Sequence, residues 1–342
     1  MILALHAAYW QSTLIKFVLV LIAVPTAAAV LVQTFLYKTM AHMQSRLGPM
    51  EAGPHGSLQL LADAGKFFQK EVLAPERADR RVFILAPVIV MVSAFLVYVV
   101  IPVGPGASGE PLDSGIFFAL AVSSISVIGI LAAGWSSANK YSLIGGLRAA
   151  GQLIAYELPL VLAVVGVVMM AGTMSLEGIV EAQSNFHLFG SSLVVPFVVP
   201  QAIGFVLFLI AAQAELIQTP FDMPIAESEL VAGYQTEYSG LPFLFFFLGE
   251  LATAFALAAI ASTIFLGGWW VPLYHPTGAW ADIFGFGVLF LKTMIVSFVI
   301  FWIRFTYPRF REDQLQAFAW KLLIPIALVN LLATAVFKVV VH

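Results

Sequence analysis

The chain has 342 residues, of which 61% are hydrophobic and only 10% are charged. Charged residues make up about 25% of an ordinary soluble domain, so this composition excludes a water-soluble globular protein and indicates one whose apolar surface is covered by lipid. Cysteine is absent, which excludes disulfide bonds and Cys-ligated zinc or iron–sulfur sites. The six histidines form no His-x-x-x-His pair, so we expect no metal site. Any electron carriers must belong to another chain or to a substrate.

Eight segments are long and apolar enough to cross a membrane, because a spanning helix needs about 20 mostly apolar residues. In chain order they are Leu14–Phe35, Val82–Val103, Gly115–Gly134, Leu153–Ala171, Leu193–Ala212, Leu241–Gly267, Phe284–Ile303 and Lys321–Val340. The first is interpreted as a retained helix rather than a signal peptide, since no small-residue cleavage site follows it. The sequence therefore predicts an all-α integral membrane protein, with residues 1–342 forming one membrane domain.

A further, amphipathic helix is predicted in the first loop, over residues 57–73. Polar side chains recur at helical spacing on one face and apolar side chains on the other. The polar face holds Gln59, Asp63, Lys66 and Lys70, and the apolar face holds Leu61, Ala64, Phe68 and Val72. Such a helix either lies flat on the membrane surface or docks on a partner protein, and the two alternatives are compatible.

Basic residues are concentrated in alternate loops. The odd-numbered loops are 36–81, 135–152, 213–240 and 304–321, and the even-numbered loops are 104–114, 172–192 and 268–283. The odd-numbered loops hold 13 of the 16 basic residues and the even-numbered loops hold none. Because cytoplasmic loops carry an excess of Lys and Arg, we predict that the odd-numbered loops are cytoplasmic and that both termini lie outside.

The fifth loop is acidic and contains no Lys or Arg. It holds Glu215, Asp222, Glu227, Glu229 and Glu237, with two prolines and apolar residues between them. One interpretation is a solvated surface loop. The other is a partly buried carboxylate cluster, in which some pKa values would rise because close like charges cannot all ionise in a low dielectric. Such a cluster would hold exchangeable protons.

Three ionisable residues lie within predicted spans: Glu157, Glu250 and Lys292. An intramembrane charge costs at least about 2.5–3.5 kcal/mol, so its default interpretation is functional, often as part of an ion path. The alternatives are an interfacial carboxylate for Glu157 and a structural ion pair for Glu250 and Lys292. The helical rise places Glu250 and Lys292 at similar depths on consecutive helices, so we predict that their side chains approach each other.

Four blocks of sequence stand out. The first is Met43–Pro49, followed by Gly53-Pro54 and Leu58–Lys66. The second is Gly134–Ala150, followed by Tyr156-Glu157, and the third is Pro220–Asp222 with Glu227–Gly240, followed by Glu250. The fourth is Leu266–Trp269, followed by Arg304, Pro308-Arg309 and Asp313–Leu315. In type and order these blocks resemble the family of quinone-site membrane subunits of bacterial NADH–quinone oxidoreductase (respiratory complex I), over about residues 1–340.

The resemblance implies a fold of eight spanning helices that forms the membrane end of a quinone chamber and the start of a proton path. Quinone is the implied substrate, and the implied partners are the other membrane and peripheral subunits, which carry the flavin and iron–sulfur clusters. This chain would then bind no cofactor and would have no catalytic redox residue. The implied location is the bacterial cell (inner) membrane, and nucleic acid is not an expected partner.

Two sets of site residues follow. The quinone-binding set is Gln44, Arg46, Leu61, Ala64, Lys66, Phe68, Phe221, Asp222, Glu227 and Glu229. The proton-relay set is Glu157, Glu215, Asp222, Glu227, Glu229, Tyr234, Glu237, Glu250 and Lys292. Without the resemblance, Arg46 beside its Gly-Pro turn would be interpreted as a contact to lipid head groups.

The chain departs from the family pattern at several polar positions, which here are apolar or neutral: Leu36, Tyr37, Met50, Ile217, Gln218 and Ile225. An equivalent subunit of a ferredoxin-, deazaflavin- or hydrogenase-linked complex is therefore an alternative, although the intact block Glu237–Gly240 favours the quinone-linked enzyme. A free-standing transporter is a third alternative, but such folds carry internal repeats with matched broken helices, and we find none in the sequence.

Overall fold

The computed structural model describes residues 9–105, 107–187, 194–272 and 279–341. Within them, the long elements are α1 (Tyr9–Leu31), which continues through a π-helical turn into α2 (Met40–Met43), α4 (Arg80–Tyr98), α5 (Gly115–Ser136), α6 (Lys140–Ala171), α10 (Gly240–Phe265), α11 (Ala279–Thr306) and α13 (Ile324–Val341). The shorter helices are α3 (Gln59–Gln69), α7 (Leu176–Ser184), α8 (Ala202–Glu215), α9 (Glu227–Leu230) and α12 (Glu312–Phe318).

Seven helices in the described part of the chain are long and apolar enough to cross a membrane. They correspond to seven of the eight predicted spans and confirm an all-α, multi-pass membrane protein. The fifth predicted span, 193–212, is wrong in its position. The helix there, α8, begins only at Ala202 and has 14 residues, or roughly 21 Å at 1.5 Å per residue, which is shorter than the about 30 Å of a bilayer core.

Prolines explain this difference. Pro196 and Pro200 lie just before α8, in a segment of turns. Proline provides no backbone N–H and disfavours helical geometry in the residue before it. The helix therefore begins only after the second proline, although hydropathy is high across the whole predicted segment.

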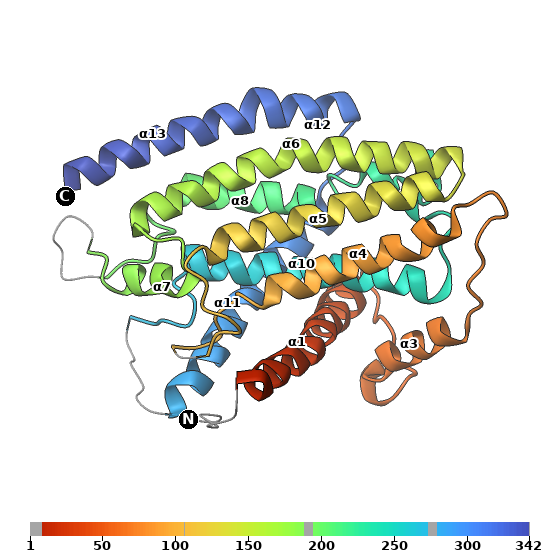
Figure 1. Cartoon of the computed structure of the whole chain (residues 1–342), viewed down its shortest axis with the longest axis horizontal. Helices are drawn as coiled ribbons and strands as arrows, with labels where there is room; N and C mark the ends of the chain where they lie inside the picture. Colours follow the sequence, from red (N-terminus) through yellow and green to blue (C-terminus); the bar gives the residue numbers. More distant parts are fainter. Residues whose placement is uncertain (1–8, 106, 188–193, 273–278, 342) are drawn as a thin grey trace.

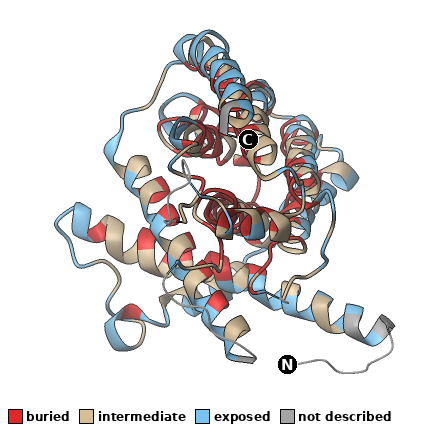
Figure 2. Ribbon diagram, turned by 90° about the vertical axis from the view of Figure 1, so that its left-hand side faces the viewer, coloured by how far each residue is buried: buried red, intermediate tan, exposed pale blue. Residues whose placement is uncertain are grey.

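The most buried of the spanning helices are α10, which runs through the middle of the bundle in Figure 1, and α6, and Figure 2 shows buried residues gathered toward the centre of the bundle. In their most apolar stretches 61% and 56% of the residues are buried, against 22% for the helix that includes α13. Small residues allow the close packing: a Cβ added at Gly129 of α5 would lie 2.7 Å from Val90 of α4, and one at Gly249 of α10 would lie 3.1 Å from the same side chain. Thus α4 fits between two glycines of its neighbours.

Polar loops gather at one end of the bundle. Figure 1 shows α3 and the turn between α5 and α6 at its right-hand end, with α7 and the last turn of α13 at the other. We call the first end, formed by residues 44–79, 137–140, 216–239 and 307–311, the polar end. It includes most of the residues of the odd-numbered loops, and seven of the 16 basic residues lie within these ranges.

The three basic residues outside the odd-numbered loops each have a partner. Lys16 lies 3.4 Å from Glu110. Lys338 donates to the carbonyl of Met169 at 2.5 Å, in the last turn of α6, and Lys292 donates to carbonyls at the end of α10. Cations are stabilised at helix C-termini, where carbonyl groups lack intrahelical partners. These two lysines therefore cap the ends of α6 and α10 opposite the polar end.

The predicted amphipathic helix is present as α3, shorter than predicted at both ends. None of its residues is buried, and Leu61 and Phe68 are 69% and 68% exposed. The ring of Phe67 stacks on Phe243 at 5.7 Å, and Asp63 accepts a hydrogen bond from Tyr37. Burial opposes ionisation of Asp63, but its hydrogen bonds, chiefly from Tyr37, hold its pKa below the usual value. α3 is thus attached through its polar side, which leaves its apolar side free.

Candidate functional site at the polar end

The fifth loop is held by buried glutamines. Gln152 of α6 is 1% exposed and donates to the carbonyls of Ala214 and Phe221, both at 2.8 Å. Gln213 at the end of α8 donates to the carbonyl of Thr219 at 2.8 Å. These bonds satisfy backbone carbonyls that would otherwise be buried without partners, and they draw the chain after α8 into a tight turn that ends at Asp222.

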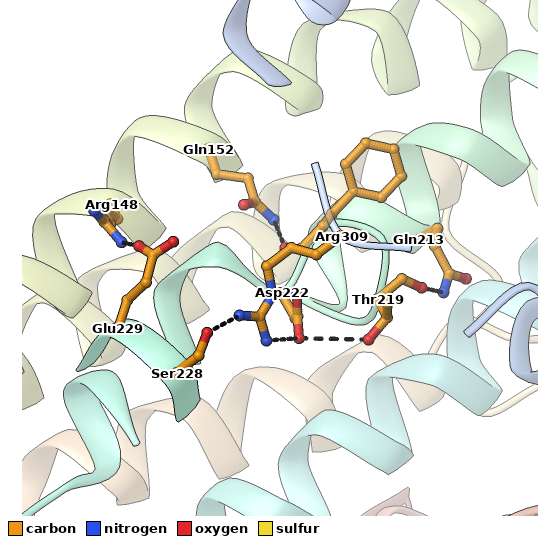
Figure 3. A network of polar contacts seen from close by, with 9 residues as sticks. Arg148, Gln152, Gln213, Thr219, Asp222, Ser228, Glu229 and Arg309 are labelled. Atoms are coloured by element: carbon orange, nitrogen blue, oxygen red, sulfur yellow. Dashed lines mark hydrogen bonds and ion pairs between the residues drawn. The ribbon is translucent and has the colours of Figure 1, made fainter. Parts of the chain in front are cut away.

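Arg309 binds Asp222 with two nitrogens. Nε lies 2.6 Å from Oδ1 and Nη2 lies 2.7 Å from Oδ2, while Nη1 donates to Ser228 at 3.1 Å (Figure 3). Two parallel bonds between a guanidinium and a carboxylate are among the strongest polar contacts in proteins. The bond to Asp222 raises the pKa of Arg309. Arg309 therefore fastens both the turn at Asp222 and the short helix α9.

Arg148 of α6 holds the exposed side of α9. It lies 2.6 Å from Glu229 and 3.2 Å from Glu312 of α12. Glu227 and Glu229 are both exposed. The expectation that these two acids are partly buried is wrong, because both side chains lie at the surface and Glu229 pairs with Arg148. Their role in the proton path stays a prediction.

Glu250 and Lys292 are not partners, so the predicted pairing is wrong. Glu250 lies 3.2 Å from the amide of Gln218 and 3.4 Å from Arg304. Lys292 instead donates to the carbonyls of Leu266, Gly268 and Trp270, at 2.7, 2.9 and 2.7 Å. Leu266 follows Glu250 by 16 residues, roughly 24 Å along α10. Lys292 and Arg304 both belong to α11, but Lys292 binds carbonyls after α10 whereas Arg304 lies against Glu250. The depth of a residue along its helix does not predict which partner its side chain finds.

Two other predicted relay carboxylates lie between α5, α6 and α8. Glu157 accepts a hydrogen bond from Ser124. Glu215 contacts the hydroxyl of Ser123 and lies close enough to Glu157 for their charges to interact. Neighbouring serines on α5 thus face two acids from different helices, so the structure brings Glu157 and Glu215 together.

The remaining relay residues lie beside the turn between α5 and α6. Asn139 donates to Glu237, next to an open surface cavity of about 550 Å³ lined by residues 75–77, 137–141 and 237. Tyr234 is buried and accepts a hydrogen bond from Gln235 at 3.1 Å. Burial and the charge of Glu250 raise the pKa of Tyr234, so this phenol stays protonated at neutral pH.

The predicted quinone-binding residues fall into two groups. Gln44 and Arg46 are hydrogen bonded to each other at 2.8 Å on the exposed first loop, and the α3 residues follow on the same loop. In the fifth loop, Phe221 is 3% exposed. Its ring lies among those of Tyr156, Phe310 and Phe318, so Phe221 packs the loop onto the bundle.

The sequence alone does not indicate the partners of the acids: Ser123, Ser124, Asn139, Arg148, Gln218 and Arg309. Several of these residues lie inside the four sequence blocks, which mark them as candidates for the site. The blocks do not indicate which acid each residue contacts.

The fold and the site define a multi-pass membrane protein with carboxylates between its helices and an arginine-fastened acidic loop at one end. A family model described as NADH dehydrogenase matches residues 15–335. The chain therefore belongs to the NADH dehydrogenase family.

Several curated relatives are named as the H subunit of NADH-quinone oxidoreductase. The one from Brevibacillus brevis is 46% identical over 97% of this chain and 95% of its own length. One from Dehalococcoides mccartyi is 47% identical over 86% of this chain and 78% of its own length. One from Geobacillus kaustophilus is 46% identical over 88% of this chain and 86% of its own length.

Proposed function

We propose that this chain is a membrane subunit of a proton-translocating NADH–quinone oxidoreductase, the counterpart of these relatives. The observation that carries the proposal is identity of 46% to the Brevibacillus brevis relative across nearly the full length of both chains. The chain has no cysteine and so cannot hold a thiolate-ligated iron–sulfur cluster. The chain contributes part of the quinone site and the start of the proton path, and the electrons come from the flavin and iron–sulfur clusters of partner subunits.

The quinone site lies at the polar end. A quinone has a polar head group and an apolar isoprenoid tail, so its site needs polar groups beside an apolar route from the membrane. The first and fifth loops supply the polar groups, including Arg46 and Asp222. The apolar side of α3, with Leu61 and Phe68 exposed, supplies a surface along which the tail remains in hydrocarbon while the head group moves into the protein.

The proton path starts at the same end. Reduction of a quinone to a quinol takes up two electrons and two protons, so the groups near the fifth-loop acids that supply these protons become more negative by the charge they give up. Glu215 and Glu157 lie beside each other between the helices, with serine hydroxyls in contact. Hydroxyl and carboxyl groups in contact are suited to passing a proton from the loop into the bundle.

The orientation follows from the charges of the loops. Because 13 of the 16 basic residues lie in the odd-numbered loops, the polar end faces the cytoplasm of a bacterial cell with the chain in its cell membrane. The partner subunits that carry flavin and iron–sulfur clusters then dock on the polar end.

Copurification tests the proposed function. After mild detergent extraction, this chain should be recovered with flavin- and NADH-binding subunits and with NADH–quinone reductase activity. Recovery of a nickel-containing partner would instead assign it to a hydrogenase-linked complex, and recovery of the chain alone would contradict the proposal.

The variant Phe68→Asp tests the route of the quinone tail. A charge on the apolar side of α3 should raise the apparent KM for a long-tailed quinone more than for a short, soluble analogue, because only the long tail passes along α3. Phe68→Leu keeps the surface apolar and should leave both KM values near those of the parent enzyme. Equal effects of Phe68→Asp on the two quinones would show that α3 does not guide the tail.

Glu227→Gln and Glu229→Gln test proton loading by the fifth loop. Each change keeps the size of the side chain but removes its titration, so proton pumping per electron should fall while the complex assembles normally on a native gel. Glu312→Gln is the matched control, because Glu312 is the second partner of Arg148 but is not in the loop. Normal pumping in both loop variants would show that these acids are only a solvated surface.

A further inference from the structure

Gln218 is a buried amide whose two polar atoms differ in their surroundings. The residue is 2% exposed. Its Nε2 donates to Glu250 Oε1 at 3.2 Å, but its Oε1 is buried and has no hydrogen-bond partner among the described residues. A side chain that served only for packing would do better without an unpaired buried carbonyl. The unpaired carbonyl oxygen of Gln218 therefore points to a role of this side chain beyond packing.

The backbone holds this amide in place. Ile217 has a φ of +52°, in the left-handed region that a β-branched residue rarely adopts. The carbonyl of Gln218 accepts a hydrogen bond from the backbone N–H of Phe221 at 2.8 Å. The turn thus keeps Gln218 facing α10 at the level of Glu250.

The other groups around Glu250 provide one cation and one phenol within the described part of the chain. Arg304 of α11 lies 3.4 Å from the oxygen that Gln218 also contacts, and its guanidinium lies over the rings of Phe301 and Phe305. Tyr234 lies close enough for the charge of Glu250 to act on it. From α4, the side chain packed against the neighbouring Gly249 is Val90, which carries no charge.

The chemistry of an amide suits a group that changes its protonation. An ionised carboxylate only accepts hydrogen bonds, whereas a carboxylic acid must also donate one. An arginine has no acceptor and serves only the ionised form. The amide of Gln218 offers a donor and an acceptor side by side.

We propose that Gln218 is a positioning residue that holds Glu250 in both its ionised and its protonated form, so that Glu250 takes up and releases a proton during turnover. In the ionised form, Nε2 donates to Oε1 of Glu250. When a proton arrives at Oε2, the new hydroxyl donates to Oε1 of Gln218 while the first bond is kept. Release of the proton reverses the step. This inference rests on the proposed function, because it assigns Glu250 to the proton path.

The test uses the whole complex in proteoliposomes and measures pumping against pH. If turnover needs protonated Glu250, activity falls as pH rises through its titration. In Gln218→Arg a second cation favours the ionised form, so this alkaline limb should move to lower pH by about one to three units. In Gln218→Met the limb should move to higher pH, because the lost bond to the ionised form is the stronger one.

Gln201→Met is the control. Gln201 is 2% exposed and is also a buried amide, but it bonds the side chains of Thr334 and Asn330 and not the turn that holds Gln218. Its replacement should leave the alkaline limb in place. Unshifted limbs in both Gln218 variants, or equal shifts in Gln201→Met, would overturn the proposal. If Gln218→Arg does not assemble, infrared spectroscopy follows the carboxylic acid band of Glu250 in Gln218→Met as the pH is raised. The band should then disappear at a higher pH than in the parent complex.

Glu250→Gln distinguishes a failure of the proposed function from a failure of the role assigned to Gln218. If this variant pumps normally, Glu250 is not on the proton path, and that part of the proposed function fails together with the inference. If it stops pumping while both Gln218 variants keep the parent pH profile, only the role of Gln218 is refuted.

Discussion

Replacing Arg309 with methionine is expected to reduce quinone reduction by about tenfold or more, because 1.4 kcal/mol equals a factor of ten. The side chains of Arg309 and Asp222 are 28% and 21% exposed, so water does not fully replace the lost pair. Removing one partner of such a pair costs about 3 kcal/mol, since the other charge stays where it is poorly solvated. The turn at Asp222 and helix α9 would then lose one of the contacts that hold them, so the fifth-loop acids would be less firmly positioned.

Two further variants make the result specific. Arg309→Lys keeps the charge but not the two parallel bonds, so it should fall between the parent enzyme and Arg309→Met. Arg311→Met is the matched control, because Arg311 is 79% exposed and pairs with its near neighbour Asp313. It should retain the parent rate. The rate is measured in membranes and divided by the amount of assembled complex. A normal rate in Arg309→Met would refute the role of Arg309 in fastening the fifth loop.

Replacing Lys292 with methionine should lower the thermal stability of the complex strongly. Lys292 donates to three backbone carbonyls at the end of α10, and a hydrogen bond to a charged group contributes about 1.5–3 kcal/mol. Without the lysine, the carbonyls of Leu266, Gly268 and Trp270 lose a donor in a setting where lipid offers none. The end of α10 and the segment after it should loosen together, which thermal unfolding of the purified complex would detect.

The combination with Glu250→Gln is a sharp test of the structure. Paired residues would give a double variant hardly worse than Lys292→Met alone. Because the two side chains have separate partners, roughly 24 Å apart along α10, their free-energy losses should instead add to within about 0.5 kcal/mol. A strongly non-additive result would mean that Glu250 and Lys292 interact after all.

Hydropathy is enough to predict most of the fold. Seven of the eight predicted spans correspond to spanning helices, since each needs only a run of apolar residues. The exception, α8, shows the limit of this signal: 193–212 is apolar throughout, but Pro196 and Pro200 delay the helix to Ala202. The short α3 is also predictable, because two faces of different polarity are visible at helical spacing.

The acids of the site are predictable as residue types, but their partners are not. A carboxylate inside an apolar segment stands out, whereas Arg148 and Arg309 lie 81 and 87 positions from Glu229 and Asp222. Only the tertiary fold places them in contact. Gln218 stands out as a departure from the family pattern, but a neutral side chain gives no reason to connect it with Glu250.

The separation of charges along the bundle has an electrical consequence. The even-numbered loops contain five acids, namely Glu110, Asp113, Glu177, Glu181 and Asp282, and no lysine or arginine. In the proposed orientation these acids lie on the side that an energised membrane makes positive. Moving one elementary charge across 100 mV corresponds to about 2.3 kcal/mol. The membrane potential that the complex helps to build therefore holds the chain in the orientation in which it was inserted.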